Sequence, residues 1–164
     1  MPFEELEVLF EDLGSYPTKE QLTEMLNCFT SDFVINPFQV KGCNVKVILK
    51  PSYDPDFRGY PETFVHLITR ENKYKDKREF DAYRASRIHW IKPILLNHES
   101  PQIKYYEFPD KKGVIKHHYW FEAGNFLVVL KPISLDLIIV TAFCVDKNEV
   151  PKIRSRYNAF KGSL

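Results

Sequence analysis

The sequence has few of the residues that build disulfide frameworks, zinc sites or phosphate-binding loops. Its three cysteines are widely separated, odd in number and without CxxC spacing, which argues against a disulfide framework and against a zinc site. The six glycines are scattered, and no glycine-rich phosphate loop, HExxH motif or GxSxG elbow occurs. We therefore expect chemistry without a metal and without a cofactor.

Long hydrophobic runs are also missing. The longest apolar run, LIIVTAFCV at 137–145, suits a strand and is too short to span a membrane. The first ten residues, MPFEELEVLF, lack the basic region followed by an apolar stretch that a signal peptide has. We expect a protein of the reducing cytoplasm with no membrane partner.

What is present is a globular composition with an uneven distribution of charge. The 164 residues can form one well-cored domain. Residues 1–40 carry a net charge of −7, whereas the remaining residues carry +8. Two explanations are open: solvated helix faces of opposite sign, or a basic body that meets a polyanion.

Apolar spacing predicts two helices at the start of the chain. Residues 3–13 have apolar side chains at helical intervals up to Gly14, and a second apolar stripe follows Thr18, where Gln21 completes a capping box. These two helices predict an acidic helical hairpin over residues 1–40.

The remainder, residues 41–164, predicts mainly strands around one basic helix. Asp76 is a possible cap for that helix, and Pro93 breaks or restarts it. The predicted strands are 44–50, 62–70, 102–108, 113–122, 125–131 and 135–145, followed by a last helix at 147–158. Short links between the later strands favour antiparallel neighbours. The prediction is an α+β fold, with a helical hairpin and then a twisted antiparallel sheet on which the basic helix packs.

The segment FVHLITR, residues 64–70, contains the first candidate site. In a strand, His66 and Arg70 would project from the same face. On the helix that follows, Arg84 and Arg87 are three residues apart and would share a face. Together these residues can converge on a phosphate. The alternative is a solvated basic helix beside a structural histidine.

Two later strands add hydroxyl groups to the candidates. In HHYW, residues 117–120, Tyr119 and His117 face one way, so that Tyr119 could serve a site or simply pack across strands. Thr141 lies near the end of an apolar strand and could contact a phosphate or fill space. Histidine, arginine, tyrosine and threonine without a metal suit RNA cleavage, in which a histidine takes the proton of the 2′-hydroxyl and arginines stabilise the phosphate.

The order of these features resembles the barnase–EndoU–colicin–RelE nuclease superfamily, and in particular its phage-associated branch. The resemblance rests on H-x-x-x-R at 66–70, R-x-x-R-I at 84–88 followed by P-I-L, IKYYEF at 103–108, and L-x-x-x-T-A-F at 137–143. It implies a metal-independent endoribonuclease, toxin-like or phage-effector-like, with RNA as substrate and a protein inhibitor or antitoxin as a possible partner. The residues carried over are His66 as general base, with Arg70, Arg84, Arg87, Tyr119 and Thr141.

Two other functions fit the same residues. A non-catalytic nucleic-acid-binding module would use the same basic residues and aromatics for binding alone. A protein-interaction domain, antitoxin-like or a phage accessory protein, would bind its partner through the acidic segment and ignore nucleic acid.

Overall fold

A computed structural model describes residues 6–72, 74 and 77–162 of the chain. The predicted α+β class is confirmed. The main sheet has the order β1-β2-β8-β7-β6-β5. Its strands are β1 (Gln39–Val40), β2 (Cys43–Lys46), β5 (Ile103–Pro109), β6 (Ile115–Phe121), β7 (Phe126–Ile133) and β8 (Asp136–Cys144). The four later strands form the predicted antiparallel meander, whereas β2 pairs with β8 in parallel.

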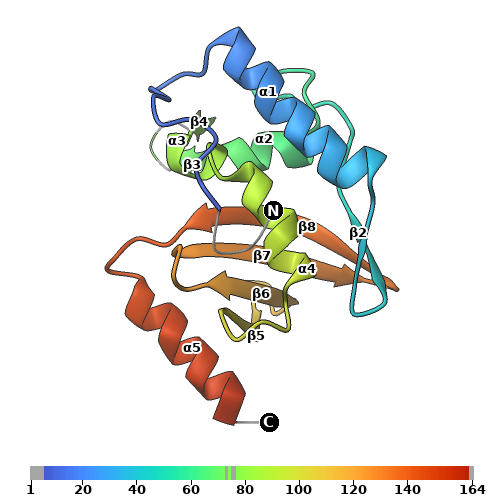
Figure 1. Cartoon of the computed structure of the whole chain (residues 1–164), viewed down its shortest axis with the longest axis vertical. Coiled ribbons are helices and arrows are strands. Elements are labelled where there is room, and N and C mark those ends of the chain that lie inside the picture. The colour runs from blue at the N-terminus through green and yellow to red at the C-terminus, as the bar shows by residue number, and fades with distance from the viewer. Residues whose placement is uncertain (1–5, 73, 75–76, 163–164) are drawn as a thin grey trace.

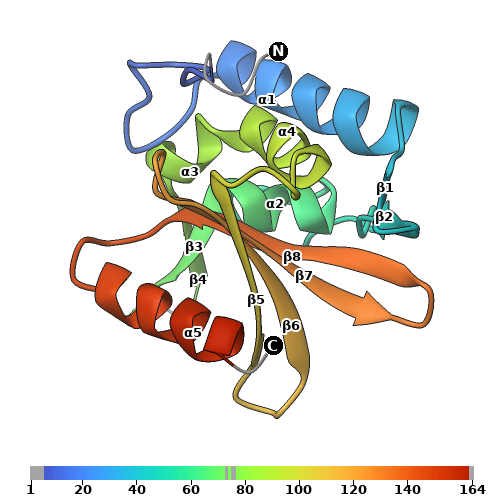
Figure 2. The same cartoon turned by 60° about the horizontal axis from the view of Figure 1, so that its bottom comes forward.

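Helices cover the two faces of this sheet unequally. One face carries the helical layer, which consists of α1 (Lys19–Thr30), a π-helical turn (Ser31–Ile35), α2 (Glu62–Ile68), α3 (Ala82–Ala85), a 3-10 turn (Ile88–Trp90) and α4 (Ile91–Leu96). Of the helices among the described residues, α5 (Val150–Gly162) alone lies on the opposite face, as Figures 1 and 2 show. In the described part of the chain, no helix has the length and apolar character needed to cross a membrane.

Each face of the sheet has its own hydrophobic core because the strand residues alternate in direction. On β6, Tyr119 and Phe121 join the large core under the helical layer, whereas Trp120 joins a smaller core under α5. Phe29 of α1 belongs to the large core, so the N-terminal segment and the sheet share one interior.

A β-bulge interrupts the alternation in β8. Val129 pairs with Thr141 and Leu130 pairs with Ile139, so Val140 is an extra residue without a partner on β7. Ile139 belongs to the large core, but Thr141 lies opposite Val129 and therefore faces the side of α5. The bulge thus turns Thr141 away from the interior in which regular alternation would place it.

The predicted helix over residues 3–13 is wrong for the described residues 6–13, which have no regular structure; residues 3–5 lie outside the described range. Their apolar side chains still pack against the large core. The backbone bonds elsewhere, because Leu9 N donates to Ser86 O at 2.7 Å and Glu7 O accepts from Trp90 Nε1 at 2.9 Å. Contacts with the rest of the protein replace the hydrogen bonds of a helix. Of the predicted hairpin, α1 remains, with both hydrogen bonds of its capping box.

The predicted strand over residues 62–70 is also wrong, because residues 62–68 form α2 and only then does a strand begin. That strand, β3 (Thr69–Asn72), pairs with β4 (Lys77–Phe80) in a separate hairpin. The run is short and apolar almost throughout, so its periodicity cannot separate a buried helix from a buried strand. Residues 62–68 form a helix because apolar side chains on several sides of it are buried between the sheet and the other helices.

The predicted basic helix begins later than expected. Its proposed cap, Asp76, lies outside the described residues, and Lys77–Phe80 is a strand. Asp81 caps α3 instead, since its side chain accepts from Arg84 N at 3.2 Å. Helix α3 ends at Ala85, and the 3-10 turn and α4 follow it in the chain.

Candidate active site and the groove beside it

The side chains of two arginines, Arg78 and Arg84, meet at the carbonyl of Thr69, where α2 passes into β3. We call His66, Thr69, Arg78, Arg84 and Thr141 the basic cluster. Arg84 Nη1 lies 2.7 Å from Thr69 O, 3.4 Å from His66 O and 3.3 Å from Thr141 Oγ1. One guanidinium group therefore connects α2, β3 and the bulged strand β8.

Arg84 is also paired with a carboxylate. Its Nε lies 3.3 Å from Asp81 Oδ2, and the two side chains are only 12% and 15% exposed. Asp81 thus serves both as the cap of α3 and as the counter-ion of Arg84. The pair has little access to water, so each charge depends on the other.

Arg78 is a residue that the sequence prediction did not place in the site. From β4, its Nε donates to Thr69 Oγ1 at 2.8 Å and its Nη2 donates to Thr69 O at 3.0 Å. The carbonyl of Thr69 therefore accepts from two arginines. In a strand, Arg78 and Phe80 lie on one face and Glu79 lies on the other. This pattern could have placed Arg78 on the inner face with Phe80, but only if the segment had been predicted as a strand.

His66 lies beside these arginines with a free imidazole. Its side chain is half-buried, and neither ring nitrogen has a hydrogen-bond partner among the described residues. Burial lowers the pKa of His66, and the charges of Arg78 and Arg84 lower it further against the opposing effect of Glu62 and Glu71. The imidazole is therefore neutral at pH 7, which is the form that accepts a proton.

Arg70 does not share a strand face with His66, because the two residues belong to different elements. Arg70 lies on β3, is 59% exposed, and pairs with Glu79 across the hairpin at 3.0 Å. It remains near the basic cluster, since its charge lowers the pKa of Arg84. The predicted geometry is wrong, although the two residues are neighbours.

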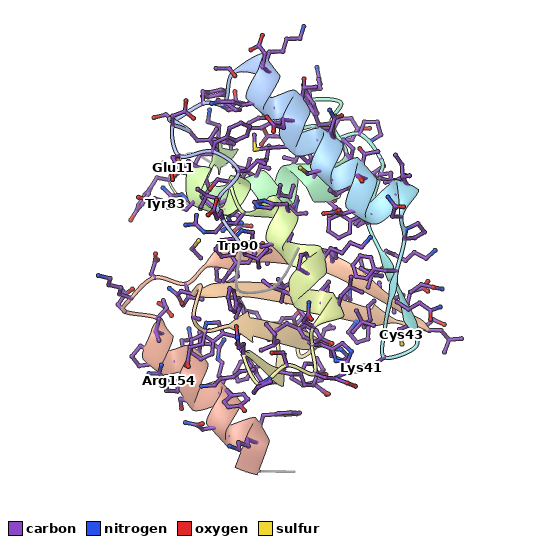
Figure 3. The ribbon with its side chains drawn as sticks, viewed as in Figure 1. Glu11, Lys41, Cys43, Tyr83, Trp90 and Arg154 are labelled. Carbon is purple, nitrogen blue, oxygen red and sulfur yellow. The ribbon has the colours of Figure 1, made fainter. Side chains whose placement is uncertain are left out.

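Arg87 faces the N-terminal segment rather than the basic cluster. It lies beyond the end of α3, so it does not share a helix face with Arg84. Its Nη1 donates to Tyr83 O at 2.8 Å, and its guanidinium lies over the ring of Trp90. With Glu11 and Tyr83 it lines a cavity of about 330 Å³ (Figure 3).

Tyr119 lies on the opposite face of the sheet from Thr141. It is fully buried in the large core and packs against Tyr105, with ring centroids 4.9 Å apart. Lys41 reaches this pair from the β1–β2 turn, its Nζ 3.5 Å from the centroid of the Tyr105 ring (Figure 3). The fold therefore does not bring Tyr119 to the other predicted residues.

A groove opens on the α5 side of the sheet and shares Thr141 with the basic cluster. Its volume is about 480 Å³. Its lining comes from β5 to β8, the β5–β6 turn and α5, and includes Phe108, Asp110, Lys111, Lys116, His118, Val129, Thr141, Phe143, Ile153 and Arg156. Thr141 belongs to both the groove and the cluster. We call this feature the α5 groove.

His118 lies in the lining of the groove in one defined protonation state. Burial lowers its pKa to about 4, so it is neutral at pH 7. Its Nδ1 lies 3.1 Å from Lys116 O, and a carbonyl can only accept, so the ring proton sits on Nδ1. Nε2 is then an acceptor without a partner among the described residues. The ring stacks on Tyr106.

Comparisons of the chain with models of known protein families, with curated proteins and with solved structures give no match. The geometry of the basic cluster and of the α5 groove is therefore the basis for a functional proposal.

Proposed function

We propose that the protein is a metal-independent endoribonuclease that cleaves RNA by attack of a 2′-hydroxyl on the adjacent phosphate. One observation carries this proposal: a free, neutral imidazole at His66 lies beside two arginines that converge on one carbonyl. A neutral histidine is the general base that the first step needs, and fixed positive charge is what the phosphate needs as it gains a bond.

The residues have separate roles in this mechanism. His66 accepts the proton of the 2′-hydroxyl, and the freed oxygen attacks phosphorus to form the 2′,3′-cyclic phosphate. Arg78 and Arg84 are held by Thr69, and their remaining N–H groups stabilise the charge on the phosphate. His118 is neutral and a poor acid at pH 7, so water supplies the proton for the departing 5′-oxygen.

Cleavage in the presence of EDTA tests the reaction type. The purified protein should cut an RNA oligonucleotide in EDTA and leave 2′,3′-cyclic phosphate ends, detected by mass spectrometry. The same sequence as DNA, or with 2′-O-methyl groups, should stay intact because it has no hydroxyl for the attack. Intact RNA with folded protein, or equal cutting of the methylated strand, would overturn the proposal.

The pH dependence of cleavage tests His66 as the base. The base works only when neutral, so kcat/KM should fall only as pH drops through a pKa below the ordinary 6.5. Arg78→Met removes a charge that lowers this pKa, so the pKa should rise and the acidic limb should move to higher pH. An NMR titration of the ring would measure the same shift.

Lys77→Met is the matched control for this titration. Lys77 precedes Arg78 on β4 but pairs with Asp56, and its charge is not among those that shift the pKa of His66. The control profile should coincide with that of the unchanged protein. A limb that stays in place in Arg78→Met, or moves to lower pH, contradicts the assignment.

One observation favours a second function, RNA binding without cleavage. The arginines of the basic cluster already donate to Thr69, and Arg84 is also paired with Asp81. If these bonds hold both side chains fully, the cluster is structural. Binding would then weaken steeply with salt, RNA would remain intact, and His66→Ala would have no effect on affinity.

The biological setting that fits a ribonuclease of this kind is the cytoplasm. The three cysteines are free thiols, and RNA is the substrate there. We place the protein among toxin-like or phage-associated effectors, for which a protein inhibitor is an expected partner. Cellular RNA would otherwise be cut wherever the protein is made.

A further inference from the structure

The α5 groove is a fixed feature of the fold because α5 is anchored over the sheet. Arg154 Nη2 donates to Glu122 Oε2 at 3.0 Å, and the same carboxylate pairs with Lys104 at 3.0 Å. Figure 3 shows Arg154 on α5. Ile153 is buried in the smaller core between helix and sheet. The helix therefore forms a permanent wall of the groove.

The groove is positively charged, and two of its cations, Lys111 and Arg156, have no ion pair among the described residues. Lys111, Lys116 and Arg156 line it against the single carboxylate of Asp110, which pairs with Lys116 at 3.1 Å. Among the described residues, no carboxylate pairs with Arg156. Its guanidinium stacks 3.9 Å above the ring centroid of Phe108, which fixes the side chain in the wall. An arginine that is held in place and has no carboxylate partner suits a phosphate group.

The floor of the groove offers aromatic and polar surface beside this charge. Phe108 and Phe143 line the groove, and His118, Val129 and Thr141 form one row across three strands. A basic groove with aromatic side chains is the arrangement by which proteins hold single strands, whose unstacked bases are free to pack on rings. A duplex already stacks its bases and cannot place one on this floor.

We propose that the α5 groove binds single-stranded RNA and leads the strand to the basic cluster at Thr141. RNA as the polymer rests on the proposed function, whereas the groove, its charge and its junction with the cluster are structural. An acidic peptide shares the negative charge but has no bases to pack on Phe143, and it gains nothing from the contact between Thr141 and Arg84 of the basic cluster. The structure therefore favours a nucleotide strand.

Binding of a fluorescent single-stranded RNA to Arg156→Met tests this proposal. The measurement is made in the His66→Ala background, so that the RNA stays intact. Methionine keeps the contact with Phe108 but loses the charge, so binding should weaken roughly tenfold and the slope of log K against log salt should fall by about 0.7. Lys152→Met is the matched control. Lys152 lies on the same helix, is 57% exposed, pairs with Glu149 and does not line the groove.

Each other outcome overturns a defined part of the proposal. Equal losses in both variants mean that α5 binds only through general surface charge. A duplex that binds as tightly as the single strand, or an acidic peptide that displaces RNA equally well, removes the single-strand assignment. If the unchanged protein cleaves RNA and Arg156→Met binds it normally, the groove assignment fails and the ribonuclease stands. If RNA binds in the groove but is never cut, the ribonuclease proposal fails and the groove assignment stands.

Discussion

We expect His66→Ala to lower the rate of the proposed RNA cleavage by roughly 10²- to 10⁴-fold, the usual contribution of a general base. The imidazole is the only ring in the basic cluster, and its pKa is lowered by burial and by Arg78, so it is the group that can take the 2′-hydroxyl proton at neutral pH. The substitution leaves both arginines in place. Affinity for intact RNA should therefore change far less than kcat, as single-turnover assays and binding titrations can show.

His98→Ala serves as the control for that experiment. His98 packs with its ring centroid 6.5 Å from that of Tyr119, on the other face of the sheet from the α5 groove. Its loss should leave cleavage near the level of the unchanged protein. Equal losses in both variants, or full activity without His66, would remove the histidine from the mechanism, provided that thermal unfolding shows both variants to be folded.

Arg84→Met destabilises the protein by about 3 kcal/mol, the low end of the range for breaking a buried ion pair, because both side chains keep a little exposure. The change leaves the carboxylate of Asp81 without its counter-ion. It also removes a donor from His66 O and from Thr141 Oγ1, and one of the two donors to Thr69 O. The measurement is the shift of the urea unfolding midpoint with an unchanged slope.

Arg70→Met is the comparison for this prediction. Arg70 pairs with Glu79 at a distance similar to that of Arg84 and Asp81, but its side chain is 59% exposed. Exposed ion pairs contribute about 0–1 kcal/mol, so this variant should unfold close to the unchanged protein. Similar midpoints for the two variants would mean that Arg84 does not hold α2, β3 and β8 together. Activity of Arg84 variants should be measured well below their unfolding temperature, so that lost stability is not counted as lost catalysis.

The sequence could predict most of the sheet, because the runs that form β5 to β8 are rich in apolar, β-branched and aromatic residues, have the length of strands and are joined by short turns. It could not predict FVHLITR, since a short run that is apolar on all sides lacks the period that separates helix from strand. The error had a limited effect on the candidate site. His66 and Arg70 follow one another so closely in the chain that either structure leaves them near the same corner of the molecule.

Other parts of the site depended on information that no local pattern contains. Arg84 and Thr141 are 57 residues apart, and their contact follows from the packing of α3 on β8. Arg78 enters the cluster because β4 turns it toward Thr69. Tyr119 was assigned correctly to one side of its strand with His117, but only the packing of the helices reveals that this side is the core.

Because of the extra residue Val140, consecutive residues of β8 face two different surroundings, the polar α5 groove and the apolar large core. Thr141 is partly exposed and lines the α5 groove, whereas its neighbour Ala142 is 1% exposed and belongs to the large core. Removing one residue from this stretch would exchange their sides, placing a hydroxyl in the core and a methyl group in the α5 groove. The length of β8 is therefore under tighter constraint than its composition. Variants that differ by a conservative side chain should be tolerated here, while those that differ by one residue in length should lose both the core and the end of the groove.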